Sequence, residues 1–360
     1  MYLLVDAHED LAWNILALGR DYTRPADETR QHEKDTPAIQ HNGNTLLGWP
    51  DYQRARAAVV FGTLFATPIR RRLGEWDTQV YSNFEQAHHL YRTQLETYLS
   101  LTDLHAEKFR LIHTADDLED VLTAWADETE THPVGLVILM EGAEGVRTPA
   151  ELDAWWGLGV RIIGPAWAGT RFCGGTREPG ALTEDGRALL KGMAEVGFTL
   201  DLSHMDELAA RQSLDSYPGA IIASHANAAA IIPDYEGNRQ LPDMIIKGII
   251  ARDGVIGVVP YCKFLNYGWK KGDTRDGLTL ETLAAHIDHI CQMAGNARHV
   301  GLGSDFDGGF GLEAAPADVD TIADLQKLDP ILAARGYNKE DIAAILGGNW
   351  LRHLGENLPE

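Results

Sequence analysis

Residues 2–10 read Tyr2-Leu-Leu-Val-Asp-Ala-His-Glu-Asp10, a short apolar run that leads directly into a histidine and three carboxylates. The run has the length of a β-strand, and its apolar residues follow one another without alternating polar positions. Such runs are typical of strands that are buried on both faces. The stretch therefore predicts a buried strand with polar side chains at its carboxyl end.

Seven further runs of the same kind follow, and segments with helical apolar spacing separate them. The eight predicted strands span residues 2–5, 58–65, 134–140, 160–165, 198–202, 220–223, 255–260 and 300–303, and the clearest predicted helices span 83–100, 184–196, 206–213 and 280–294. This alternation predicts an α/β fold, a closed (β/α)8 TIM barrel in which residues 1–360 form one domain. A doubly wound open sheet is the competing fold, but no G-x-G-x-x-G motif follows the first run to support it.

Three stretches depart from this regular pattern. Residues 21–44 are rich in charges and amides, and they predict a long loop. Residues 171–185 and 233–242 contain glycines and prolines, and they predict irregular backbone.

The composition argues against two classes of partner. Hydrophobic residues make up 44% and charged residues 23%, which is ordinary for a soluble globular protein. The formal net charge of −22 disfavours nucleic acid, whose phosphates require a basic surface, and it equally disfavours an anionic membrane surface. We therefore predict that neither nucleic acid nor a membrane is a partner, and that the acidic surface mainly keeps the protein soluble.

The cysteines and the first residues predict the compartment. Cys173, Cys262 and Cys291 lie far apart and form no C-x-x-C pair, so neither a disulfide framework nor a thiolate zinc site is expected. No signal-peptide pattern precedes the first run, and no apolar stretch approaches the ~20 residues that a membrane span needs. We predict a cytoplasmic protein.

Five of the eight predicted strands end in a histidine or a carboxylate. In a closed barrel these ends meet at one mouth, where the catalytic residues of this fold lie. A single histidine there is usually a structural residue and a single carboxylate usually a helix N-cap, but a whole set on one rim indicates a metal site. The candidates are His8, Asp10, Glu141, His204, His225, Asp305 and Asp307.

The ligand types predict the metal and the reaction. Imidazoles and carboxylates without thiolates favour zinc, with manganese, cobalt and iron as alternatives. His8 and Asp10 alternate along extended backbone and can bind one ion, whereas His204 and His225 follow successive strands and can bind a second. Glu141 has two oxygens and can bridge the ions. Two neighbouring ions would hold a hydroxide and polarise a carbonyl, which predicts hydrolysis.

Two further residues have predicted roles beside the metals. Asp305 is a carboxylate without a metal partner, and it can pass a proton to a leaving amine. Asp307 is the alternative, although it can instead cap the following turn. Arg239 lies in the loop after the sixth strand, where it can bind a substrate carboxylate through two hydrogen bonds or be a solvated surface arginine.

These residues resemble the motifs of the membrane dipeptidase (renal dipeptidase) family of zinc peptidases, in the right order along nearly the whole chain. Residues 6–13 are similar to the family's D-G-H-N-D-L-P-W, residues 238–243 to its R-N-x-x-D segment, and residues 345–352 to its I-L-G-x-N-x-L-R. Met140-Glu141-Gly142 resembles its bridging-glutamate motif, and Asp201-Leu-Ser-His204 and Ser224-His225-Ala-Asn resemble its other histidine motifs. The most specific match is Asp288-His-Ile290 followed by Val300-Gly-Leu-Gly-Ser-Asp-Phe-Asp-Gly308.

The resemblance implies two zinc ions in an amidohydrolase-like barrel, with His8 and Asp10 on one ion, His204 and His225 on the other, and Glu141 on both. It implies that Asp305 assists proton transfer, that Arg239 contacts the substrate carboxylate, and that Tyr261 lies near the substrate. Members of the family hydrolyse dipeptides, often with a D-residue at the C-terminal position, and usually form homodimers. The first hypothesis is therefore a dipeptidase that hydrolyses short L,L- or L,D-dipeptides through a metal-bridging hydroxide.

One position departs from the family pattern. Trp167 stands where the family commonly has a histidine that is thought to stabilise the oxyanion. An indole N–H can donate one hydrogen bond but carries no charge, and losing a charged partner of an oxyanion can cost on the order of 10²–10³ in rate. The second hypothesis is therefore a related amidohydrolase acting on an N-acyl amino acid, a lactone or a cyclic amide. A third is a metal-binding pseudoenzyme.

Overall fold

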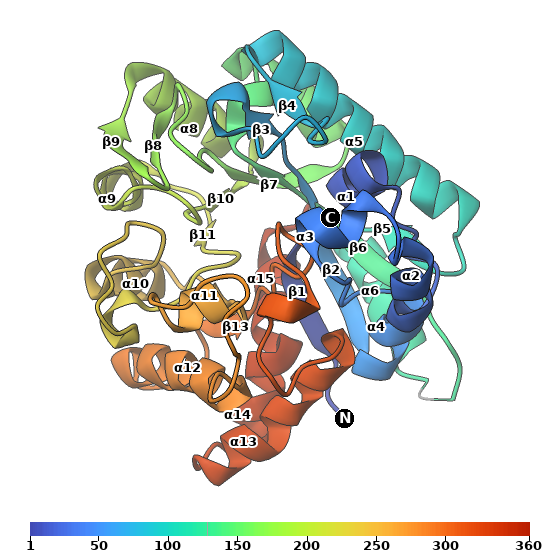
Figure 1. Cartoon of the computed structure of the whole chain (residues 1–360). Coiled ribbons are helices and arrows are strands. Elements are labelled where there is room, and N and C mark those ends of the chain that lie inside the picture. The colour runs from blue at the N-terminus through green and yellow to red at the C-terminus, as the bar shows by residue number, and fades with distance from the viewer. Residues whose placement is uncertain (128) are drawn as a thin grey trace.

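The computed structural model describes residues 1–127 and 129–360, and eight of its parallel strands form a ring surrounded by helices (Figure 1). Neighbouring strands in the ring follow the order β11-β10-β7-β6-β2-β1-β13-β12. The ring closes where Ala223, just after β11, pairs with Ile256 of β12. The strands are β1 (Leu4–Glu9), β2 (Ala57–Leu64), β6 (Val134–Glu141), β7 (Val160–Gly164), β10 (Thr199–Asp201), β11 (Ile221–Ile222), β12 (Ile256–Val258) and β13 (Val300–Leu302).

The predicted TIM barrel is confirmed. Each of the eight apolar runs overlaps one of these strands, and every residue of the eight strands is buried. The longest ladder joins β2 to β6 and pairs Val59 with Gly135 through Leu64 with Met140. Because both faces of each strand are covered, the runs have no need of alternating polar residues.

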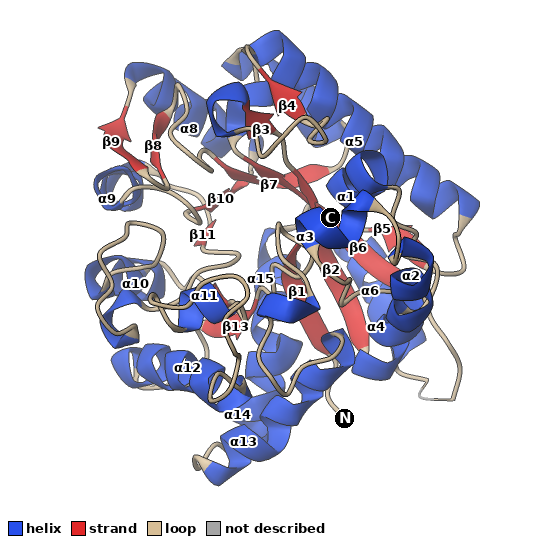
Figure 2. Ribbon diagram, in the orientation of Figure 1, coloured by secondary structure: helices blue, strands red, loops and turns tan. Residues whose placement is uncertain are grey.

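The outer ring consists of helices that lie outside the strands (Figure 2). The four clearest predicted helices are present, with ends that differ by a few residues from prediction. Thr183 caps α8 by accepting a hydrogen bond from the N–H of Gly186, and Gly197 ends it in the left-handed region. The helices are α1 (Leu11–Leu18), α4 (Trp49–Ala55), α5 (Phe84–Leu104), α6 (Ala115–Trp125), α7 (Leu152–Gly157), α8 (Glu184–Val196), α9 (Glu207–Ser216), α10 (Asp243–Ala251), α11 (Cys262–Leu265), α12 (Leu280–Ala294), α13 (Leu328–Ala334), α14 (Lys339–Ala343) and α15 (Asn349–Asn357).

The prediction of a long loop at residues 21–44 is wrong, because this stretch contains α2 (Ala26–Glu33) and α3 (Pro37–Asn42). The residues of α2 are almost all polar, so no apolar periodicity reveals the helix. Contacts distant in sequence stabilise the segment instead. Glu33 pairs with Arg20 at 3.1 Å, and the side chain of Asn42 donates to the backbone oxygen of Asp307 at 2.7 Å.

The other two irregular stretches differ from each other. Residues 171–185 contain a hairpin of β8 (Cys173–Gly175) and β9 (Glu178–Leu182), so the prediction there is wrong. A Cβ atom on Gly174 would lie 2.1 Å from the backbone nitrogen of Gly180, so only glycine permits this approach. Residues 233–242 contain no helix or strand beyond an isolated bridge at Leu241, as predicted. Three short strands, β3 (Thr67–Pro68), β4 (Val80–Tyr81) and β5 (Phe109–Leu111), complete the set.

The seam where β11 meets β12 is packed backbone to backbone. The N–H of Ala223 donates to the oxygen of Val255 at 3.0 Å, and the N–H of Gly257 donates to the oxygen of Ala223 at 2.8 Å. A Cβ atom on Gly257 or on Gly303 would lie 1.9 Å from the carbonyl oxygen of Ser224. Two glycines therefore allow the chain after β11 to approach its neighbours.

Asp307 fastens the segment of α2 and α3 to the mouth of the barrel rather than capping the turn that follows it. Its side chain is completely buried, and its Oδ2 atom lies 3.0 Å from Nη1 of Arg20. The carboxylate also accepts hydrogen bonds from the hydroxyl of Tyr22 at 3.0 Å, the hydroxyl of Thr45 and the N–H of Leu46 at 3.1 Å.

We expect Asp307→Ala to lower the free energy of unfolding by about 3–5 kcal/mol, because it removes one of the two carboxylates that pair with the buried guanidinium of Arg20 and leaves three buried donors without their acceptor. Urea denaturation measures the change. The control is Asp320→Ala, which removes an exposed carboxylate paired with Arg30 and should cost less than about 1 kcal/mol. Equal losses in the two variants would contradict the role of Asp307.

Candidate metal centre and active site

The predicted metal ligands all lie at the carboxyl ends of barrel strands. His8 belongs to β1, Asp10 follows it, and Glu141 is the last residue of β6. His204 and His225 lie three residues beyond the ends of β10 and β11. His204 adopts φ 64°, a left-handed conformation that is uncommon for a residue with a side chain and most often marks a special site.

One group of nitrogen and oxygen atoms has the spacing of ligands around a single ion. Nε2 of His204 and Nε2 of His225 lie 3.0 Å apart, and they lie 3.1 and 3.4 Å from Oε1 of Glu141. Zinc–nitrogen bonds of 2.0–2.1 Å in a tetrahedron place ligand atoms about 3.3 Å apart. The three side chains therefore match one metal position.

Glu141 takes part in a second group through its other oxygen. Its Oε2 atom lies 3.9 Å from Nε2 of His8, and ligand atoms of His8, Asp10 and Glu141 all lie within 4.8 Å of one another. The structure thus brings together the five residues in the two sets that the sequence predicts. That they bind ions stays a prediction.

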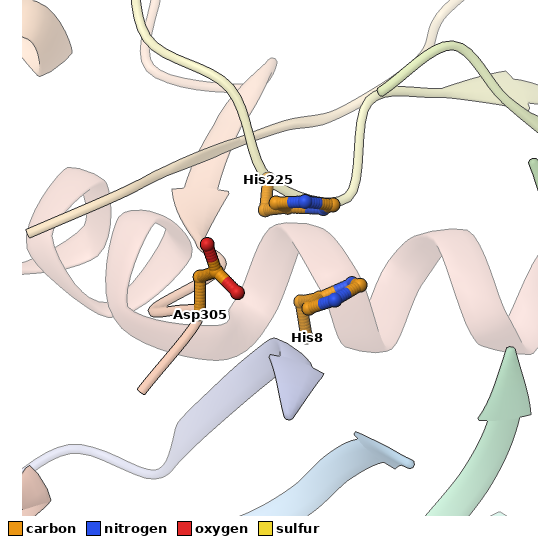
Figure 3. A group of neighbouring side chains, drawn as sticks. All are labelled: His8, His225 and Asp305. Carbon is orange, nitrogen blue, oxygen red and sulfur yellow. The ribbon is translucent and has the colours of Figure 1, made fainter. Parts of the chain in front are cut away.

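Asp305 lies at the same centre. It forms a third group with His8 and His225, with ligand atoms again within 4.8 Å, and Figure 3 shows its carboxylate beside the two imidazoles, which lie one above the other. Its backbone has φ 57°, and its N–H donates to the oxygen of His8 at 3.2 Å. The carboxylate is therefore placed beside both predicted metal positions.

Burial sets the charges of this cluster. It lowers the pKa of His8 to about 3 and lowers the pKa of His225, so both imidazoles are neutral and their nitrogens are free to bind a metal. Burial also raises the pKa of Asp10 to about 7 and, with the charges of neighbouring carboxylates, raises the pKa of Glu141 and of Asp305. The site gathers more carboxylates than its own cations can neutralise.

Several buried atoms of the cluster have no hydrogen-bond partner among the described residues. They are Nδ1 and Nε2 of His8, Oδ1 of Asp10 and Oε1 of Glu141. Unpaired buried polar atoms are costly, and divalent cations satisfy nitrogen and carboxylate donors of this kind. The residues therefore fit a metal centre.

Neighbouring polar groups orient the two histidines that follow β10 and β11. Oγ1 of Thr176 lies 2.9 Å from Nδ1 of His204, and Oγ of Ser224 lies 2.9 Å from Nδ1 of His225. Each hydroxyl can accept the Nδ1 hydrogen and so leave Nε2 to face the centre. Thr176 was not predicted, because it reaches the site from the turn between β8 and β9 and no motif links it to His204.

Arg239 is buried rather than solvated, so the surface alternative is wrong. Nη2 donates to the backbone oxygen of His225 at 2.8 Å, and the guanidinium lies over the ring of Phe264 at 5.0 Å. Nε and Nη1 have no hydrogen-bond partner among the residues that the structure describes. A guanidinium held in this way is ready to bind an anion through its free N–H groups.

Two aromatic side chains lie near these groups. Tyr261 stacks on Phe310 with ring centroids 4.2 Å apart, and burial together with the charge of Asp305 raises its pKa to about 12. Trp167 is half-buried, with its ring 6.2 Å from that of His204 and 5.0 Å from that of Phe65. Phe65 and Phe310 were not predicted, since neither an aromatic residue in an apolar run nor one between glycines has a distinguishing signal.

Comparison with known proteins gives consistent matches over the whole chain. The model of the family described as membrane dipeptidase (peptidase family M19) matches residues 1–358. Dipeptidase tcpJ of Claviceps purpurea is 27% identical over 366 residues, which cover 98% of this chain and 76% of that protein. The crystal structure of dipeptidase AC, a metallopeptidase of family M19, is 25% identical and has a TM-score of 0.77 over 100% of this chain and 99% of that chain.

A further solved structure shares the fold. It is a metallopeptidase from Rhodobacter sphaeroides, liganded with a phosphinate mimic of the dipeptide L-Ala-D-Ala. It is 24% identical, with a TM-score of 0.77 over 99% of both chains. The shared architecture therefore extends over the whole barrel.

Zinc added to the chelator-treated protein should raise the melting temperature by about 5 °C at saturating concentration, because binding neutralises the buried carboxylates. Differential scanning calorimetry measures the shift. His225→Ala should lose most of it, since His225 belongs to two of the three groups. His289→Ala, which changes a histidine paired with Asp243 outside the site, is the control and should keep it. A shift of the same size in His225→Ala would exclude this centre as the binding site.

Proposed function

We propose that this chain, which belongs to the membrane dipeptidase family (peptidase family M19), uses two zinc ions to hydrolyse the amide bond of short L,L- or L,D-dipeptides. The chain is a hydrolase of the metallodipeptidase class, and the choice of metal, the number of ions and the substrate are the proposal. The observation that carries it is the pair of nitrogen and oxygen groups that share Glu141. Its donors suit zinc because they combine imidazoles with carboxylates.

His8, Asp10 and Glu141 would hold one ion, and His204, His225 and Glu141 the other. Bound ions would polarise the substrate carbonyl and lower the pKa of a water molecule. The protein side chains would fix that geometry from four separate strands, so each donor is positioned by the barrel wall rather than by a mobile loop.

Asp305 would move the proton in this reaction. It lies beside His8 and His225, where it can take a proton from the attacking water and give it to the leaving amine. Its buried position excludes bulk solvent from this transfer.

Arg239 would fix the length of the substrate. Its free Nε and Nη1 groups can bind a carboxylate close to the metal centre, which leaves room for one residue between the scissile amide and the carboxyl terminus. Trp167 and Tyr261 would line the remaining wall. The indole N–H of Trp167 can still donate one hydrogen bond where the resemblance expects a histidine.

Trp167 also supports a second candidate, hydrolysis of an N-acyl amino acid, a lactone or a cyclic amide. An N-acyl amino acid has the same terminal carboxylate for Arg239 to bind. A lactone or a cyclic amide has an activated ring, and its hydrolysis would need less of the oxyanion stabilisation that a histidine at the position of Trp167 would give. The pseudoenzyme hypothesis would require the loss of a proposed ligand or of the proposed proton carrier. Against it stands the presence of all six residues in the three groups: His8, Asp10, Glu141, His204, His225 and Asp305.

We further propose that residues 1–360 act as one domain, that the protein forms a homodimer, and that it works in the cytoplasm. Its three cysteines are free and buried, which agrees with a reducing compartment. None of the described helices has the length and apolar character to cross a membrane. A monomer mass in sedimentation velocity would contradict the dimer.

Zinc-loaded protein should release amino acids from a panel of L,L- and L,D-dipeptides, and Asp305→Asn should lower kcat by about 10²–10⁴-fold while the bound metal stays. Amino-acid release and metal analysis measure the two effects. Asp243→Asn, outside the site, is the control and should keep full activity. Hydrolysis of lactones or N-acyl amino acids alone would select the second candidate, and an inactive panel at full metal occupancy would overturn both.

Arg239→Gln should lower kcat/KM for a dipeptide about 10²-fold, because the substrate carboxylate loses a buried charged partner. The same dipeptide with an amidated C-terminus should be a poor substrate for both proteins and should show little difference between them. Arg211→Gln on the exposed face of α9 is the control. If the variant slowed both peptides equally, Arg239 would not be the carboxylate-binding residue.

A further inference from the structure

The turn between β8 and β9 presents an arginine that the proposed chemistry does not use. Gly175 pairs with Glu178, so Thr176 and Arg177 form the turn. Arg177 adopts φ 63°, a conformation that costs little for glycine or asparagine and more for a long side chain. Its side chain is exposed. An arginine in this unfavourable backbone conformation suggests that its guanidinium has a ligand to bind.

The turn is held firmly against the metal centre. The N–H of Thr176 donates to the oxygen of Trp167 at 3.0 Å, and its hydroxyl contacts Nδ1 of His204 at 2.9 Å. The N–H of Arg177 donates to Oδ1 of Asn238 at 2.9 Å. Arg177 is therefore fixed at the rim, beside a proposed metal ligand.

Asn238 connects the turn to the carboxylate-binding loop. Its side chain also donates to the oxygen of Gly175 and to Asp206, both at 3.0 Å, and the next residue along the chain is Arg239. The side chain of Asn238 thus links the turn that contains Arg177 to the loop that contains Arg239. The backbone of Arg177 therefore lies directly beside the loop that would hold the substrate's terminal carboxylate.

The charge of Arg177 is available to a ligand. Its guanidinium forms no ion pair with the residues that the structure describes, and the carboxylate nearest in sequence, Glu178, is already paired with Arg70 and Arg71. Burial dominates the pKa of both His204 and Tyr261, and the positive charge of Arg177 acts on each as a smaller influence: it adds to the lowering of the pKa of His204 and opposes the raising of the pKa of Tyr261. These two groups come from different parts of the barrel, so the charge acts on the space that a substrate would enter.

We propose that Arg177 is a specificity-determining residue that binds a second carboxylate of the substrate, on the side chain of an acidic residue at its C-terminal position. This inference rests on the proposed dipeptidase function. Arg239 would take the terminal carboxylate, and Arg177, linked to it through Asn238, would take the carboxylate of the same residue's side chain. The substrate's amino group is a cation and is repelled from this part of the rim.

The preference is local in origin. A protein with a net charge of −22 does not attract an acidic ligand through its overall field, so any gain must come from a nearby cation. Because Arg177 is exposed, solvent and salt weaken its effect. We expect a preference of about ten-fold at low ionic strength, which decreases as salt is added.

Alanyl-glutamate and alanyl-glutamine, each with an L- or a D-residue at the C-terminus, test this directly, because the two side chains have the same shape and differ in charge. The zinc-loaded protein should show a kcat/KM about ten-fold higher for glutamate than for glutamine. Arg177→Gln should bring that ratio to about one and leave the glutamine peptide within about two-fold of the unchanged protein. Arg187→Gln, an exposed arginine on α8, should keep the ratio.

Three results would overturn the inference while leaving the dipeptidase proposal intact. They are a ratio near one in the unchanged protein, an unchanged ratio in Arg177→Gln, and an equal loss on both peptides in that variant. If neither peptide is hydrolysed, the dipeptidase proposal fails, and calorimetric titration of the zinc-loaded Asp305→Asn protein with the same peptides decides the role of Arg177. Tighter binding of the glutamate peptide that disappears with Arg177 supports it, and equal binding overturns it.

Discussion

The desolvation of Glu141 is the constraint on which the mouth of the barrel depends. A carboxylate at the end of a fully buried strand has lost its water, and its neighbours Asp10 and Asp305 add like charge. The three imidazoles around it are neutral, and the charge of Arg239 offsets this repulsion only in part. Protons or bound cations relieve this repulsion, and the proposed metal ions would do so at the point where the carboxylate and imidazole atoms converge.

The barrel and the centre of the site were predictable because both follow from strand burial. Fully buried strands leave continuous apolar runs, and polar residues that directly follow these runs, such as Glu141 and His225, lie at the mouth of the barrel. The remainder was not predictable for a physical reason. Thr176, Asn238 and the helix α2 owe their positions to partners far away in the chain. Thr176 bonds to His204, and Arg177 bonds to Asn238. The local sequence pattern does not indicate such partners.

Two polar side chains, one buried and one half-buried, join segments outside the barrel strands. Asp307 ties the segment of α2 and α3 to the end of β13, and Asn238 ties the β8–β9 hairpin to the loop of Arg239. Each satisfies several backbone or side-chain groups at once. The barrel supplies the metal ligands, whereas these two side chains arrange the surfaces that would select a substrate. Change in substrate preference can therefore proceed in the loops without disturbing the ligands.

The seam between β11 and β12 both closes the barrel and leads into His225, a proposed metal ligand. Its backbone bonds at Ala223 lie two residues before His225, and glycines on both sides let that chain sit against its neighbours. Local opening of the wall would begin where a ladder is short, and opening of the single bridge at this seam would carry a proposed ligand away with it. The lifetime of the bound ion and the integrity of the cylinder would then decline together, as a single process.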